Sequence, residues 1–160
     1  MGPPEEAGRP LKAGDPAPDF ELLDAAGRKI RLGELLQDKV VVLFFYPKDG
    51  TPVCIAESCG FRDAYEDFVE AGAEVVGVSS DTVGSHSRFA AHHRLPFLLL
   101  SDEGGAVRTR FGVPASLGIM PGRVTYVIDR AGVIRHVFSA QLAAKKHVDV
   151  ALRVVRSLLG

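Results

Sequence analysis

The sequence has few of the features that mark several common classes of protein. Its 160 residues include only two cysteines and no tryptophan, and the formal net charge is -1. This balanced charge gives no sign of a nucleic-acid or anionic-membrane partner. The longest apolar run, residues 40–46, is far shorter than the roughly 20 residues that a transmembrane helix requires. We therefore expect no nucleic-acid or membrane partner, and the 46% hydrophobic content is ordinary for one globular domain.

The N-terminus also lacks the apolar segment of a secretory signal. Residues 1–10 carry two prolines at their start, followed by Glu5 and Glu6. This composition predicts a flexible tail over residues 1–10, followed by a single domain over residues 11–160. Without an export signal the expected compartment is the cytoplasm, where thiols are kept reduced.

The two cysteines are Cys54 and Cys59, too few for the disulfide framework of a small secreted protein. Their spacing of five residues is not that of a C-x-x-C redox pair. A domain of this size has enough core to be stable without a disulfide. A chemical role therefore explains the presence of both cysteines better than a structural disulfide does.

Hydrophobic periodicity predicts an α/β protein. A turn at residues 24–27 between short apolar runs indicates an N-terminal β-hairpin, and the continuous apolar run at residues 40–46 indicates a strand buried on both faces. Strands and helices then alternate, which favours parallel pairing, with a late hairpin as an antiparallel edge. We expect a central mixed sheet with helices on both faces. The expected strands are residues 20–23, 29–32, 40–46, 74–79, 97–100, 123–128 and 133–138, and the expected helices are residues 54–71, 82–94, 106–111 and 145–159.

Cys54 follows the buried strand and a loop, and is predicted to lie in the first turn of a helix. The unpaired N–H groups and the positive end of a helix favour the thiolate, which is the nucleophilic form of cysteine. Thr51 places a hydroxyl near the sulfur or a bound oxygen, and Pro47 and Pro52 stiffen the loop. The pattern predicts a reactive thiol at Cys54.

The spacing of Cys59 predicts a change of conformation. Residues five apart in a helix lie about 140° round the axis, with Cα atoms roughly 8.7 Å apart. A disulfide needs Cα atoms within about 4.4–6.8 Å. Cys54 and Cys59 can therefore bond only if the first turns of the helix unwind, and such a disulfide would be labile, as a redox intermediate should be.

The pattern Pro47-x-x-x-Thr51-x-x-Cys54 is similar to the active-site signature of the peroxiredoxins. The flanking FFYPKDGTPVC, the second cysteine five residues on and Phe61-Arg62-Asp63 resemble the peroxiredoxin Q/bacterioferritin-comigratory-protein branch. The resemblance covers nearly the whole chain from about Gly14 onward, with further motifs at residues 95–97, 100–103, 121–129 and 146–149. It implies a thioredoxin-like fold with an added N-terminal hairpin. It also implies an antioxidant peroxidase that reduces hydrogen peroxide and organic hydroperoxides, with thioredoxin as the usual reductant.

The resemblance assigns roles to six residues. Cys54 matches the peroxidatic cysteine and Cys59 the resolving cysteine, while Thr51 and Arg123 match the pair that positions the peroxide and stabilises the thiolate. Pro47 matches the residue that shields the sulfur, and Glu57 an acidic position that helps hold the arginine. The chain departs from the branch at Ile55, where Thr is usual, and at Val53, where Gly is commoner. These departures leave every catalytic group in place and bear on rate and peroxide preference.

The implied mechanism needs no cofactor and no metal. The thiolate of Cys54 attacks the O–O bond and becomes a sulfenic acid, Cys59 resolves it as an intramolecular disulfide, and a dithiol protein reduces that disulfide. Since this disulfide requires no partner subunit, we expect a monomer. Two other functions share the features of the sequence: a disulfide oxidoreductase of the thioredoxin type, and a redox sensor that oxidises once. The oxidoreductase leaves Thr51 and Arg123 unexplained.

Without the resemblance, the roles of several side chains stay open. Cys59 could be an inert helical cysteine, Arg123 could be a surface or ion-pair arginine, and Glu57 could belong to a solvated helix face. The neighbouring His92 and His93 point different ways on a helix and lack the spacing of zinc ligands, so we expect them at the surface. The other three histidines, His86, His136 and His147, show no partner in the sequence.

Overall fold

A seven-stranded mixed sheet forms the centre of the computed structural model, which describes residues 11–113, 115–116, 120–121, 123–139 and 144–158. The strand order is β2-β1-β5-β4-β3-β8-β9. Strands β3, β4 and β5 are parallel, while the hairpins β1–β2 and β8–β9 add antiparallel strands at the two edges. The strands are β1 (Glu21–Asp24), β2 (Lys29–Arg31), β3 (Val40–Phe45), β4 (Ala73–Ser79), β5 (Leu98–Ser101), β8 (Val124–Ile128) and β9 (Ile134–Ser139).

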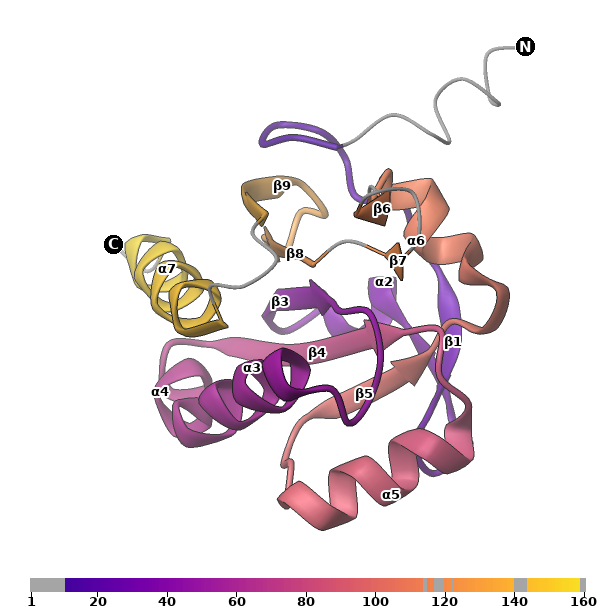
Figure 1. The fold of residues 1–160 in the computed structure, drawn as a ribbon. Coiled ribbons are helices and arrows are strands. Elements are labelled where there is room, and N and C mark those ends of the chain that lie inside the picture. The colour runs from indigo at the N-terminus through magenta and orange to yellow at the C-terminus, as the bar shows by residue number, and fades with distance from the viewer. Residues whose placement is uncertain (1–10, 114, 117–119, 122, 140–143, 159–160) are drawn as a thin grey trace, which may run out of the picture.

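Helices cover both faces of this sheet (Figure 1). They are α2 (Leu32–Leu35), α3 (Pro52–Asp63), α4 (Tyr65–Glu70), α5 (Val83–His93), α6 (Ala106–Phe111) and α7 (Ala144–Ser157). A 3-10 turn at Glu103–Gly105 precedes α6, and a separate two-stranded ribbon joins β6 (Ala115–Ser116) to β7 (Met120–Pro121). Among the described residues, no helix has the length and apolar character needed to cross a bilayer.

Strand β3 is buried on both faces, as its continuous apolar run predicts. Successive side chains of a strand point to opposite faces, so β3 contributes to two hydrophobic cores. Val41, Leu43 and Phe45 join the core beneath α2 and α6. Val42 and Phe44 join the core beneath α3, α4, α5 and α7, which also contains the side chain of Cys54.

The structure confirms the mixed sheet and both predicted hairpins, and it corrects one helix. The helix predicted over residues 54–71 is two helices, α3 and α4, separated at Ala64, whose ψ of 5° is not helical. Phe61 and Phe68 are both fully buried and stand seven residues apart, close to two helical turns. Because the apolar spacing continues across the break, the sequence gives no sign of it. The short helix α2 was not predicted, and the predicted tail over residues 1–10 lies outside the described residues.

Candidate active site

Cys54 lies in the first turn of α3, as predicted. The helix begins at Pro52, a residue that fits the first helical position because it has no N–H group to satisfy. Thr51 is the N-cap, with extended backbone angles, and its carbonyl accepts the N–H of Ile55 at 2.8 Å. The Cys54 side chain is fully buried, and its thiol is free. The cysteine is therefore held at the positive end of a helix, out of bulk solvent.

Arg123 reaches the Cys54 sulfur because of the strand register. Strand β8 pairs antiparallel with β3 so that Val124 lies opposite Phe45, and Arg123 stands just before β8, at the end of β3 that leads into α3. Its Nη2 donates to the Cys54 Sγ at 3.2 Å. The side chain is only 3% exposed, so the alternative of a surface arginine is wrong. A guanidinium in this position favours the thiolate by charge and by hydrogen bonding.

Glu57 lies on the same side of α3 as Cys54, three residues further on, and is also fully buried. Its Oε1 accepts a hydrogen bond from Arg123 Nη1 at 2.6 Å. Burial raises the pKa of Glu57 to about 7, although the charge and hydrogen bond of Arg123 act to lower it. The alternative of a solvated helix face is wrong for this residue. Arg123 is thus shared between the sulfur and a carboxyl group that titrates near neutral pH.

A histidine that the sequence does not single out completes this buried group. His147 of α7 is fully buried, with its Nδ1 2.7 Å from Thr125 Oγ1 and 3.4 Å from Glu57 Oε2. Helices α3 and α7 lie side by side (Figure 1). This packing accounts for the approach of His147 to Glu57. The only sequence signal for His147 was its place in the motif at residues 146–149, which the resemblance covers.

Thr51 and Pro47 lie in the loop between β3 and α3. The Thr51 hydroxyl donates to the Lys48 carbonyl at 3.0 Å and makes no capping bond to α3. A hydroxyl that donates in this way can still accept a hydrogen bond. Both residues are half-buried. Ile55, the residue after Cys54, packs against the same core as Cys54 and so favours the folded state of α3.

Cys59 lies on α3 with a free, half-buried thiol. Its Sγ is 3.8 Å from Nδ1 of His93, at the end of α5. The two cysteines stand five residues apart in one continuous helix, so they cannot form a disulfide with each other while α3 is intact. His93 is half-buried and contacts a cysteine, which corrects the interpretation of it as a surface residue.

A polar cluster anchors the loop before Cys54. Asp49 accepts hydrogen bonds from Tyr46 at 2.6 Å and Ser85 at 2.8 Å, faces His86 at 2.7 Å, and donates its N–H to Asp81 at 2.7 Å. Burial raises the pKa of Asp49, but the hydrogen bonds of His86, Tyr46 and Ser85 outweigh it, so the net shift is downward. Within the described ranges, Asp49, Asp81 and His86 are the one group with metal-ligand spacing. Their facing atoms already bond one another and their neighbours, which fits an anchor for the loop.

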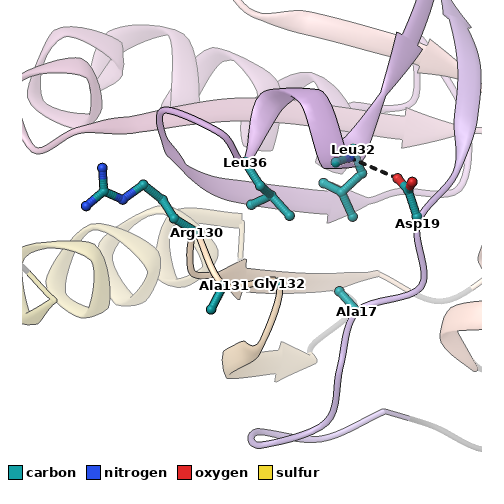
Figure 2. Close-up of a pocket in the computed structure, with 8 residues that line it drawn as sticks. Ala17, Asp19, Leu32, Leu36, Arg130, Ala131 and Gly132 are labelled. Atoms are coloured by element: carbon teal, nitrogen blue, oxygen red, sulfur yellow. Dashed lines mark hydrogen bonds between the residues drawn. The ribbon is translucent and has the colours of Figure 1, made fainter.

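A shallow pocket of about 270 Å³ lies away from these residues, beside α2 and the β8–β9 turn (Figure 2). Asp19 at its edge accepts the Gly33 N–H at 2.9 Å, and Arg130 extends away from the other labelled side chains. None of the six predicted site residues lines it. Its lining offers no thiol or hydroxyl side chain, and we assign it no part in the chemistry.

The chain is similar to known proteins over most of its length. The sequence pattern of the AhpC/TSA family matches residues 13–137. The chloroplastic peroxiredoxin Q of Sedum lineare is 49% identical over 146 residues, covering 91% of this chain and 78% of the relative. That of Oryza sativa subsp. japonica is 47% identical over 149 residues, covering 92% and 68%. The crystal structure of peroxidoxin BcpB from Mycobacterium tuberculosis superposes with a TM-score of 0.87 at 42% identity, covering 92% of this chain and 98% of that chain.

Fold and site together define a two-cysteine thiol peroxidase built on a thioredoxin-like fold. The chain belongs to the AhpC/TSA family and, within it, to the peroxiredoxin Q/bacterioferritin-comigratory-protein branch. The resemblance seen in the sequence, and the thioredoxin-like fold that it implied, are confirmed.

The buried Glu57 carboxyl gives a pH-dependent stability that can be measured. Its pKa is about 7 in the folded protein against 4.5 when unperturbed, so the folded state binds the extra proton between these values. Its contribution to stability is therefore fully present below about pH 4.5 and is lost as the pH rises through 7. We expect the unfolding free energy of Glu57→Gln, relative to that of the parent, to rise by up to about 3 kcal/mol between pH 4.5 and 8.

Urea unfolding of both reduced proteins at a series of pH values measures this difference. Any effect of the Glu57→Gln amide on the unfolding free energy that does not depend on pH is the same at every point of the series. Only the change with pH in the difference between variant and parent is used, so this constant amount cancels. A difference that does not change with pH would show that Glu57 titrates normally.

Proposed function

We propose that Cys54 is the peroxidatic nucleophile, which reduces hydrogen peroxide and organic hydroperoxides and is then resolved by Cys59. The observation that carries this proposal is the 3.2 Å hydrogen bond from the Arg123 guanidinium to the Cys54 sulfur at the start of α3. Arg123 stays charged at any physiological pH, so it favours the thiolate without competing for its proton.

In the first step the Cys54 thiolate attacks one peroxide oxygen. The S–O bond forms as the O–O bond breaks, water or an alcohol leaves, and the sulfur becomes a sulfenic acid. Arg123 stabilises the charge that moves from sulfur to oxygen, and the Thr51 hydroxyl accepts a hydrogen bond from the peroxide. Pro47 shields the sulfur from water. Glu57 holds the second nitrogen of Arg123 and so fixes the orientation of the guanidinium.

In the second step α3 unwinds and Cys59 attacks the sulfenic acid, releasing water and forming the disulfide. A dithiol protein of the thioredoxin type then reduces the disulfide by exchange. The cycle requires no cofactor, no metal and no partner subunit, so residues 11–160 act as one monomeric domain. It fits the cytoplasm, where a thiol-based reductant is available.

Stopped-flow mixing of the reduced protein with one equivalent of hydrogen peroxide tests the proposal. We expect consumption far faster than by a free thiol, followed by an intact mass that has lost two hydrogens under non-reducing conditions. Consumption at the rate of a free thiol would exclude an activated Cys54, and the assay for insulin-disulfide reduction would then test the oxidoreductase alternative.

Replacing Cys59 separates the two steps. We expect Cys59→Ser to keep the parent's rate of first reaction with peroxide, because the Cys54–Arg123 contact does not involve Cys59. The same variant should lose thioredoxin-coupled turnover, measured by NADPH oxidation with thioredoxin and its reductase. Full turnover in this variant would remove the resolving role from Cys59.

A further inference from the structure

The thiol of Cys59 is held against a histidine of another helix. Its Sγ lies 3.8 Å from Nδ1 of His93, the last residue of α5, which is 34 residues further along the chain. This distance is within the range of an S–H···N hydrogen bond, in which an unprotonated Nδ1 accepts from the thiol. The contact brings a base to the one sulfur that must act as the second nucleophile.

The contact is fixed by a second bond between the same two helices. Arg62 stands three residues after Cys59 on α3, and its Nη1 donates to the His93 carbonyl at 2.8 Å. Its Nε also bonds Asp63 at 3.0 Å. The pKa of Arg62 is raised, mainly by Asp63 and also by the charge of Cys59, so the guanidinium lies close enough to attract a thiolate there.

The surroundings of His93 favour the neutral imidazole. Burial lowers its pKa, and the charges of His92 on the same helix and Arg62 on α3 act in the same direction. The Phe89 ring packs edge-on at 4.9 Å, with no charge of its own. A neutral imidazole offers a lone pair to the thiol at physiological pH.

We propose that His93 is the general base of the resolving step, an inference that rests on the proposed function. Nδ1 of His93 takes the proton from the Cys59 thiol while α3 is still folded. As the helix unwinds, the Cys59 thiolate attacks the sulfur of the Cys54 sulfenic acid. The S–S bond forms, the S–O bond breaks, and the leaving hydroxide takes up a proton to give water. The reaction needs no oxidant beyond the peroxide already consumed.

The test is to follow the two steps separately in His93→Gln, with His92→Gln as the matched control. An amide can still bond the thiol but cannot take its proton. After mixing with one equivalent of hydrogen peroxide, peroxide loss reports the first step. Acid-quenched samples analysed by intact mass report the second, as the gain of one oxygen gives way to the loss of two hydrogens.

We expect peroxide loss at the parent's rate in both variants. Disulfide formation in His93→Gln should be about 100-fold slower near pH 7, and the deficit should shrink at high pH, where thiols ionise without a base. His92→Gln should resolve at nearly the parent's rate.

Two results would overturn the inference while leaving the proposed function intact. Unchanged disulfide formation would show that His93 takes no part. Faster formation would show that the contact only holds α3 in its folded state. A parent protein that fails to consume peroxide would instead overturn the proposed function, and that is read from the first step alone.

Discussion

Cys54→Ser is expected to reduce peroxide consumption to the level of an enzyme-free control. A hydroxyl is a weak nucleophile unless an adjacent base removes its proton. The Arg123 guanidinium, which donates a hydrogen bond to the Cys54 sulfur at 3.2 Å, cannot act as a base. The substitution therefore keeps the shape of the site and removes its nucleophile. Stopped-flow consumption of hydrogen peroxide measures the loss.

Cys59 is the internal control for this variant, since its half-buried thiol remains. Cys59 lacks the guanidinium contact that Arg123 makes with Cys54, so we expect its own reaction with peroxide to be slow. The Cys54→Ser, Cys59→Ser double variant should therefore differ little from the single one. Consumption at the parent's rate in Cys54→Ser would mean that another group is the nucleophile. Urea unfolding of the variant confirms that any loss of rate is not a loss of fold.

The sequence predicts the architecture well because the strands are strongly patterned. Every residue of the apolar run in β3 is hydrophobic, so both faces of this strand must be covered by helices. The alternation of strands and helices then implies the parallel centre of the sheet. The break between α3 and α4 could not be predicted, since Phe61 and Phe68 share one face on either side of it. Short elements such as α2, four residues long, carry too little periodicity to be detected.

The site residues likewise fall into those that the local sequence predicts and those that depend on tertiary packing. Local pattern placed Cys54 at a helix start, because a strand, a proline-rich loop and a helical run are adjacent in sequence. The contact of Arg123 with Cys54 spans 69 residues and depends on the β3–β8 register, so only the resemblance pointed to it. The contacts of His147 with Glu57 and of His93 with Cys59 depend on how helices pack beside one another on one face of the sheet, which no spacing within the chain reveals.

Arg123→Met is expected to slow the reaction of Cys54 with peroxide by about 100- to 1,000-fold, the usual cost of losing one preorganised donor at a developing charge. Methionine keeps much of the volume of the buried side chain and removes both nitrogens that bond Cys54 and Glu57. The rate of the first step, measured by stopped flow, should show the whole effect, because resolution by Cys59 follows later.

The variant also separates the chemical role of Arg123 from its structural one. Removing one partner of a buried ion pair costs about 3–5 kcal/mol when the other stays charged. Without Arg123 the pKa of Glu57 rises above its present value of about 7, so the stability loss should be larger at pH 8 than at pH 6. Adding Glu57→Gln should remove that pH dependence and restore stability, while the peroxide reaction stays slow. Recovery of the rate along with the stability would mean that Arg123 acts on the fold and not on the sulfur.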